Sequence, residues 1–293
     1  MGRAPHHRLG APRLASHVTW LGTLTLHYTR DGERTTAHDR HEGPLRVLQR
    51  LYPEGPGICH HVLVHPPGGI VGGDVLELAA TLEAGTHALI TTPGATRFYR
   101  SSGAAAAQHA RLRVSEGARL EWLPLESLAY SGCIAENRVQ LDLANGAEAI
   151  GWDVLALGLP AADEAFKAGS FTQHLELPGR WIERGRIAAD DARLLDSPLG
   201  LAGLRVMATV WFASGSTMPD ARREAFLEAA RECASRSLLA ARCGATSPFE
   251  GVIVMRALAE RVEPAMALLH QVRGAWRHLA WGLAPNPPRV WQT

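Results

Sequence analysis

A stretch rich in proline and glycine at residues 65–74, reading His-Pro-Pro-Gly-Gly-Ile-Val-Gly-Gly-Asp, constrains this chain more than any other segment. Its two prolines fix the backbone angle φ and remove two amide donors, and its four glycines permit backbone angles that are closed to other residues. No helix can run through such a segment. Apolar residues 62–64 lead in and an alternating segment, residues 75–82, leads out, so we predict a shaped turn between two strands.

Three kinds of chemistry use a glycine-rich turn, and the neighbouring residues distinguish them. A Walker phosphate loop needs Lys followed by Ser or Thr after its last glycine, whereas Asp74 and Val75 follow here. A dinucleotide fingerprint opens a helix with G-x-G-x-x-G, whereas these glycines are paired and precede a strand-like segment. What remains is a corner that positions the Asp74 carboxylate for function, or a structural bend in which Asp74 accepts hydrogen bonds from nearby amides. Composition favours the bend.

Three later segments repeat one pattern, in which an apolar residue, two turn residues and a glycine precede a new alternating strand. The glycines are Gly85, Gly117 and Gly146, spaced 32 and 29 residues apart. Regular spacing of this kind predicts stacked β layers. The alternative is a meandering sandwich whose hairpins have similar lengths.

Helical patterns enter the chain only after about residue 200. We predict a polar N-terminal arm at residues 1–17, a β-rich stacked domain at 18–199, and a strand–helix–strand–helix segment at 200–293 that packs on this domain and ends in an extended tail. The strands and helices expected in the last segment are 204–213, 219–236, 251–257 and 264–281. The expected fold class is mainly β, with stacked β-helix-like layers and two C-terminal α-helices.

Charge and cysteine content exclude several kinds of partner and site. Lysine and arginine total 30 against 29 acidic residues, so no overall field attracts nucleic acid or an anionic membrane. No stretch approaches the ~20 apolar residues of a membrane span. The four cysteines are scattered without a C-x-x-C pair, which indicates a reducing cytoplasm and no structural zinc.

Histidines cluster at His60, His61 and His65, beside the glycine-rich turn. On a helix the last two would share a face, but the apolar residues between them favour a strand. In a strand they lie about 13 Å apart, too far to bind one ion. We therefore expect no dedicated histidine metal site. The chain also lacks the G-x-S-x-G elbow that would indicate a catalytic serine nucleophile.

Three carboxylates lie in or beside apolar β segments, namely Asp74, Asp153 and Glu183. If the fold brings them together around a wet interior passage, they offer hard oxygen ligands to a divalent cation in transit. The alternative is that each pairs with an arginine. Composition alone favours the ion pairs. The arginines considered for this role are Arg97, Arg100 and Arg184.

Five ordered motifs carry a family resemblance. The first is the glycine-rich stretch 65–74. The others are Thr-Pro-Gly-Ala-Thr-Arg-Phe-Tyr-Arg-Ser at 92–101, Leu-Glu-Trp-Leu-Pro at 120–124, Gly-Trp-Asp at 151–153 and Pro-Arg-Val-Trp at 288–291. In these motifs, from about residue 18 to the end, the chain resembles the urease accessory protein family UreD, called UreH in some organisms. Leu125 and Leu159 stand where Gln and Arg are common in the family, so no polar contact is carried over at those positions.

The resemblance implies an accessory scaffold in urease maturation and no enzymatic activity. Family members bind apo-urease and dock UreF, and through UreF the GTPase UreG, in a complex that delivers nickel to urease. The resemblance also implies a mostly β stacked fold with two helices and an internal passage for the ion. It implies no tightly bound cofactor, only transient nickel.

Carried over position by position, the resemblance makes Asp74, Asp153 and Glu183 candidates for the lining of that passage, with Thr96 nearby. Candidate partner-binding residues, toward UreF, are Trp276, Trp281 and Trp291. Residues of the structural motifs are Gly68, Gly69, Gly72, Gly73, Arg100 and Trp152. Two alternatives stay open: a hydrolase or lyase in which Asp74 and Asp153 act as an acid–base pair, and a plain adaptor that makes no contact with an ion.

Overall fold

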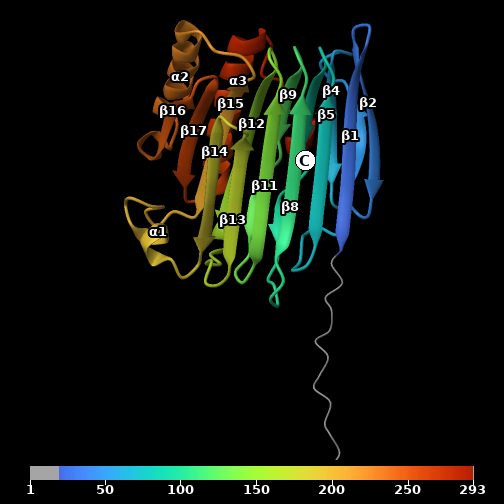
Figure 1. The fold of residues 1–293 in the computed structure, drawn as a ribbon. Helices are drawn as coiled ribbons and strands as arrows, with labels where there is room; N and C mark the ends of the chain where they lie inside the picture. The colour runs from blue at the N-terminus through green and yellow to red at the C-terminus, as the bar shows by residue number, and fades with distance from the viewer. Residues whose placement is uncertain (1–19, 293) are drawn as a thin grey trace, which may run out of the picture.

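Two β-sheets packed face to face form most of the computed structural model, which describes residues 20–292 (Figure 1). Sheet A has seven strands in the order β14 (Trp181–Ala188), β13 (Ser170–Leu177), β11 (Ile134–Leu143), β8 (Ala106–Val114), β5 (Val75–Leu82), β1 (Leu21–Asp31) and β2 (Arg34–Glu42). Sheet B has ten strands, eight of them in the order β16 (Cys243–Phe249), β17 (Val252–Ala259), β15 (Val206–Ser214), β12 (Glu148–Leu157), β9 (Arg119–Leu123), β6 (His87–Thr91), β4 (Ile58–Val64) and β3 (Arg46–Leu51). The other two are β10 (Ser127–Ala129), which pairs with β12, and β7 (Thr96–Phe98), which pairs with β10.

The chain winds between the two sheets, so that consecutive long strands from β4 to β13 alternate between sheet B and sheet A. Within sheet A, β5, β8, β11 and β13 are parallel, and within sheet B, β4, β6, β9 and β12 are parallel. Hairpins would make neighbouring strands antiparallel, whereas parallel neighbours require crossovers. The predicted stacked layers are therefore confirmed, and the meandering alternative is not observed in these layers.

The repeated glycines lie at turns of successive layers. Gly85, Gly117 and Gly146 have φ values of +68°, +66° and +74°, which only glycine adopts readily. The amide of Gly85 donates to the carbonyl of Glu116 in the next layer at 3.2 Å. The spacing of these three glycines in the sequence therefore corresponds to the length of chain in one layer.

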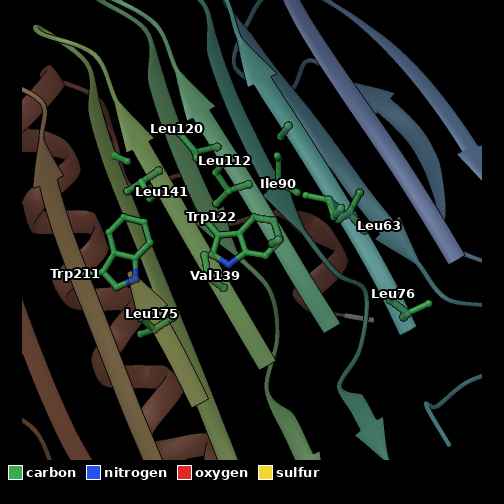
Figure 2. Packing of buried hydrophobic residues seen from close by; sticks show 14 of the residues in the cluster. Leu63, Leu76, Ile90, Leu112, Leu120, Trp122, Val139, Leu141, Leu175 and Trp211 are labelled. Atoms are coloured by element: carbon green, nitrogen blue, oxygen red, sulfur yellow. The ribbon is translucent and has the colours of Figure 1, made fainter. Parts of the chain in front are cut away.

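The main core fills the space between the sheets. Side chains alternate along each strand, and one set from each sheet is buried, as Figure 2 shows for Leu112 and Val139 of sheet A and Trp122 of sheet B. Leu112 is fully buried and Trp122 is 5% exposed. Burial of such large apolar side chains stabilises the pairing of the two sheets by about 2 kcal/mol for each.

A second core lies on the opposite face of sheet B, under the helices α2 (Asp220–Ser235) and α3 (Val262–Trp281) (Figure 1). Phe226 of α2 and Trp276 of α3 are fully buried there against sheet B, where Trp152 of β12 is also fully buried. The two predicted helices are confirmed, with ends displaced by one or two residues. The remaining helical elements are α1 (Ala192–Asp196) and the 3-10 turns η1 (Pro160–Ala162), η2 (Ala240–Arg242) and η3 (Arg289–Gln292).

The strands after residue 200 continue sheet B. β15 pairs antiparallel with β12, and β17 pairs antiparallel with β15. Strand β16 pairs with β17 and was not predicted from the sequence. The C-terminal segment is thus joined to the stacked layers by a continuous hydrogen-bonded sheet as well as by helix packing. The predicted arm at residues 1–17 lies outside the described residues.

The glycine corner, residues 65–74, carries the chain from β4 of sheet B to β5 of sheet A, so the predicted turn between two strands is confirmed. Gly68 and Gly73 have φ values of +79° and +98°. Asp74 accepts a hydrogen bond through Oδ2 from the amide of Val71 at 3.1 Å. This carboxylate stabilises its own turn, as the structural interpretation of Asp74 anticipated.

The other two corner glycines are needed because neighbouring chain passes very close. A Cβ atom at Gly69 would overlap the ring of Tyr99. At Gly72 it would overlap Oγ of Ser101. Backbone hydrogen bonds hold the corner in place, because Ile70 donates to Arg97 O at 2.7 Å. The segment that follows β6 therefore shapes the corner as much as the corner's own residues do.

Candidate functional site

A carboxylate lies inside the apolar core between the sheets. Asp153 of β12 shares its face of the strand with Ala149 and Leu155, which belong to the main core, and it is only 5% exposed. From the facing strands of sheet A, Nδ2 of Asn137 donates to its Oδ2 at 2.8 Å and Nε2 of Gln173 donates to its Oδ1. Among the described residues no cationic side chain pairs with Asp153. The carboxyl group is therefore solvated by neutral amides.

These amides continue as a row across sheet A. Asn137 on β11 stands directly beside Gln108 of β8 and Gln173 of β13 in the parallel register. Nε2 of Gln108 donates to Oδ1 of Asn137 at 3.4 Å. The three amides and the Asp153 carboxyl thus make one polar row, which crosses an otherwise apolar core.

An ion pair lies beyond the row, toward the edge of the sandwich. Glu183 on β14, whose side chain is 22% exposed, accepts hydrogen bonds from Nε of Arg256 at 3.1 and 3.0 Å and also from its Nη2. Arg256 belongs to β17 of sheet B, and its cross-strand neighbour is Thr209, which is also the neighbour of Asp153. Glu183 and Arg256 therefore join edge strand β14 of sheet A to β17, the second strand of sheet B, two strands away from Asp153.

Burial controls the charge of Asp153. Desolvation above all, and the negative charge of Glu183 after it, raise the pKa of this carboxyl group to about 7, although the hydrogen bond from Asn137 acts to lower it. At neutral pH the protonated and ionised forms are therefore both populated. An ionised carboxylate in this place is a strong attractor for a cation, because the surroundings supply no compensating positive charge.

A cavity of about 310 Å³ opens at the other end of the row. Its walls come from the glycine corner, the segment 92–97 that follows β6, and inward-facing residues of both sheets. Gln108 lines this cavity and also donates to Asn137, so the polar row begins at the cavity wall. Its polar lining residues are His65, Thr92, Thr96, Arg97, Gln108 and His109.

The structure separates the carboxylates predicted as a group. Asp153 and Glu183 lie close enough for the charge of one to act on the other, and Thr96 lines the cavity. Asp74 is 8% exposed, accepts a bond from its own corner and is not part of the cavity lining. The arginine that pairs with Glu183 is Arg256, which was not among the three arginines considered from the sequence.

This separation also bears on the proposed acid–base pair. Asp153 is held between the sheets by amides, whereas Asp74 caps a surface corner, so the two carboxyl groups do not share one open pocket. Within residues 20–292, no group of three or more His, Cys, Asp or Glu side chains is placed to hold a metal ion.

Sequence reasoning missed the amides Gln108, Asn137 and Gln173. A signal was present, because each occupies a position in an alternating strand where its neighbours two residues away are apolar and buried. An amide at a core position needs a polar partner, and the partner is the buried Asp153. No feature of the sequence indicated which strands would meet.

A second buried polar cluster lies on the opposite face of sheet B and attaches α3. Glu121 of β9 is fully buried and accepts hydrogen bonds from Arg273 at 2.7 Å and from Arg277 at 3.0 Å. Arg277 also binds both carboxylate oxygens of Glu54, at 2.7 and 2.8 Å. These positive charges hold the pKa of Glu121 far below its usual range, against the cost of burial. Both arginines pair with carboxylates of the cluster, which acts as a structural anchor.

The three tryptophans predicted to contact a partner differ in exposure. Trp276 is fully buried, and its Nε1 donates to the carbonyl of Phe226 at 2.9 Å, so its ring is part of the core. Trp281 and Trp291 are partly exposed. Trp291 stacks on His270 with ring centroids 4.6 Å apart. Partner contact through Trp281 and Trp291 stays a prediction.

Two other motif residues have structural roles. The fully buried Trp152 donates from Nε1 to the carbonyl of Pro124 at 2.6 Å, which links β12 to the end of β9. The side chain of Arg100 lies against Gly132, where an added Cβ would come within 2.8 Å of it. Both contacts connect neighbouring layers.

Comparisons with known proteins agree with these motifs. A family model described as UreD urease accessory protein matches residues 21–292. The chain is 60% identical over 278 residues to the urease accessory protein UreD of Leptothrix cholodnii, covering 94% of this chain and 100% of that protein. It is 59% identical over 274 residues to the protein of the same name from Polaromonas naphthalenivorans, covering 94% and 99%. The protein of the same name from Paracidovorax citrulli is 58% identical, with the same coverage.

Proposed function

Because the chain belongs to the UreD family and is a urease accessory protein, we propose that it serves urease maturation by conducting nickel ions between its two sheets. The observation that supports this proposal is the polar row, which begins at a cavity and runs through an apolar core to Asp153. A buried row of this kind costs stability relative to apolar residues. Contact with an ion in transit would explain why the chain has such a row despite this cost.

The donors suit an ion that must enter and leave. Carboxylate, amide and hydroxyl oxygens bind divalent cations with moderate strength, whereas clustered thiolates and imidazoles would hold nickel tightly. The side-chain amides of Asn137 and Gln173 can turn about their last torsion to present oxygen in place of NH₂. Asp153 supplies the full negative charge at the centre of the row.

The path has a defined start and a closed end. An ion enters the cavity beside the glycine corner, passes Thr96 and Gln108, and reaches Asp153 by way of Asn137. Departure on the far side requires Arg256 to release Glu183, since the two side chains join the sheets there. Binding of a partner at this edge is the event that would release the pair.

The chain works within a larger assembly in the cytoplasm under this proposal. Apo-urease receives the ion, UreF docks on the chain, and UreG joins through UreF and hydrolyses GTP. Support comes from the accessory role shared with its relatives and from the glycine corner, whose sequence lacks the Lys and Ser or Thr of a phosphate loop. The four free cysteines fit a reducing compartment.

The experiment blocks the row without changing the surface. In the variant Asn137→Leu, the side chain keeps a similar volume but offers no oxygen, so we expect co-expressed urease to contain much less nickel while the accessory complex still forms. The matched control is Gln140→Leu on the same strand, because Gln140 points to the opposite face of β11. Nickel content of urease, urease activity and co-purification with UreF and urease subunits are measured together.

A plain adaptor is the second candidate, and the closed Glu183–Arg256 pair favours it. An adaptor needs no ion contact, so Asn137→Leu would then leave the nickel content of urease unchanged. Loss of the complex in Gln140→Leu would instead show that the outer face of β11 contributes to assembly.

A further inference from the structure

One histidine faces the cavity without a partner. His65 directly follows β4, where Cys59, His61 and Leu63 belong to the inward-facing set of side chains. It lines the cavity of about 310 Å³ and is partly exposed. Among the described residues none forms a hydrogen bond with its ring nitrogens.

The other histidines nearby are engaged or directed elsewhere. Nδ1 of His61 binds the hydroxyl of Tyr28 at 2.6 Å. His109 borders the cavity, but its ring lies on the outer face of β8, with Nε2 3.8 Å from Glu136. His65 is therefore the histidine of this cavity whose nitrogens are available to a bound group.

The electrostatics of the cavity leave the imidazole neutral. Burial lowers the pKa of His65, and the negative charge of Asp74 only partly opposes this effect. A neutral imidazole keeps one nitrogen lone pair for a ligand at pH 7. The nearby cation Arg97 donates to the carbonyl of Gly68 at 3.4 Å, and its charge also acts on Glu126.

We infer that His65 determines which ions enter the row, by offering one nitrogen ligand at the mouth of a path that otherwise presents oxygen. This inference rests on the proposed conduction of nickel. Imidazole favours borderline transition-metal ions such as nickel, whereas magnesium and calcium prefer oxygen ligands alone. A single nitrogen contact, completed by water and by oxygens such as that of Thr96, selects the ion without holding it. His61 takes no part in this contact, because its Nδ1 is bound to the Tyr28 hydroxyl.

The test follows the ring of His65 directly. In the full chain labelled with ¹⁵N-histidine, the ring signals of His65 are assigned by their absence in His65→Gln, or in His65→Asn should the first variant not fold. We expect substoichiometric Ni²⁺ to broaden these signals beyond detection, because the ion is paramagnetic. The same concentration of Mg²⁺ should leave them unchanged. His109→Gln is the matched control, since its ring lies on the outer face of the sheet.

Each outcome separates the inference from the proposed function. If nickel binds at the row and perturbs other signals while the ring of His65 is unaffected, His65 has no role in selection and the inference is wrong, although conduction stands. If the ring of His65 responds equally to Mg²⁺, the site does not discriminate and the inference is again wrong. If saturating nickel binds nowhere in the cavity or the row, the proposed function itself fails.

Discussion

Glu183 of β14 and Arg256 of β17, 73 residues apart in sequence, join the two sheets near one side of the sandwich through hydrogen bonds from Nε at 3.0 and 3.1 Å and a further bond from Nη2. The charge of Glu183 also reaches the buried Asp153, whose pKa it raises. One ion pair therefore both links the two sheets and adjusts the charge at the centre of the sandwich.

Removing the charge of Glu183 tests its effect on the pKa of Asp153. In Glu183→Gln the negative charge that raises the pKa of Asp153 is lost and Arg256 remains, so we expect this pKa to fall below about 7. The carboxyl ¹³C shift of Asp153, followed as a function of pH, measures it. An unchanged midpoint would mean that burial alone sets the pKa.

The pH dependence of folding stability tests the burial of Asp153. Its pKa is about 7 in the folded chain against 3.8 for an unperturbed carboxyl, so the contribution of Asp153 to stability is greatest below about pH 4 and declines as pH rises toward 7. The full effect is on the order of 4 kcal/mol. In Asp153→Asn this decline disappears, and the variant gains stability relative to the original chain at pH 8 but not at pH 4.

Urea denaturation at several pH values measures that difference. Asp142→Asn is the control, because Asp142 lies on the solvent face of β11 with a side chain that is 44% exposed. Equal stability differences at both ends of the pH range would contradict a buried, poorly solvated Asp153.

The anchor of α3 yields a third prediction. Arg277→Met leaves Glu54 without its two hydrogen bonds from Arg277 and leaves Glu121 with one arginine fewer, both in buried surroundings. Breaking a buried pair by removing one partner costs about 3–5 kcal/mol. Chemical denaturation of the purified chain should show a loss of this size. Arg111→Met, at an exposed position of β8, should change the free energy of unfolding by less than ~0.5 kcal/mol.

The glycine corner provides the fourth prediction. Gly69→Ala places a methyl group against the ring of Tyr99, so we expect a loss of about 1–3 kcal/mol and a distorted cavity wall. Gly185→Ala is the control, because a Cβ there meets no atom within 4 Å. Replacing the Tyr99 ring by a smaller side chain should relieve the overlap. The double variant Gly69→Ala with Tyr99→Leu should therefore lose less stability than the sum of the losses of the two single variants. Thermal unfolding of the original chain, the two single variants, the double variant and the Gly185→Ala control tests this.

Much of the local architecture could be predicted from the sequence. The corner at residues 65–74 was recognised because proline and glycine restrict or release the backbone wherever they stand. The stacked layers followed from the spacing of Gly85, Gly117 and Gly146, since each layer uses a similar length of chain. The two long helices followed from their apolar periodicity. Strand β16 escaped prediction because its residues, 243–249, include Gly and Pro and lack a clear alternation.

The site was predicted only in part. Asp153 was singled out as a charge within an apolar strand, and the structure finds it buried among amides. Asp74 was grouped with it, but its carboxylate binds the adjacent backbone of its own corner. A buried carboxylate and a turn-capping one look alike in sequence, because the distinction depends on what the opposite sheet presents.

The sequence by itself determined backbone conformation, strand alternation and family membership, because these depend on residues close together in the chain or on motifs preserved in order. Only the tertiary structure decided that Asn137 and Gln173 face Asp153, that Arg256 pairs with Glu183 across the sheets, and that His65 reaches a cavity. Such contacts depend on which strands become neighbours and in which register. A shift of one residue would turn every one of these side chains to the other face of its sheet.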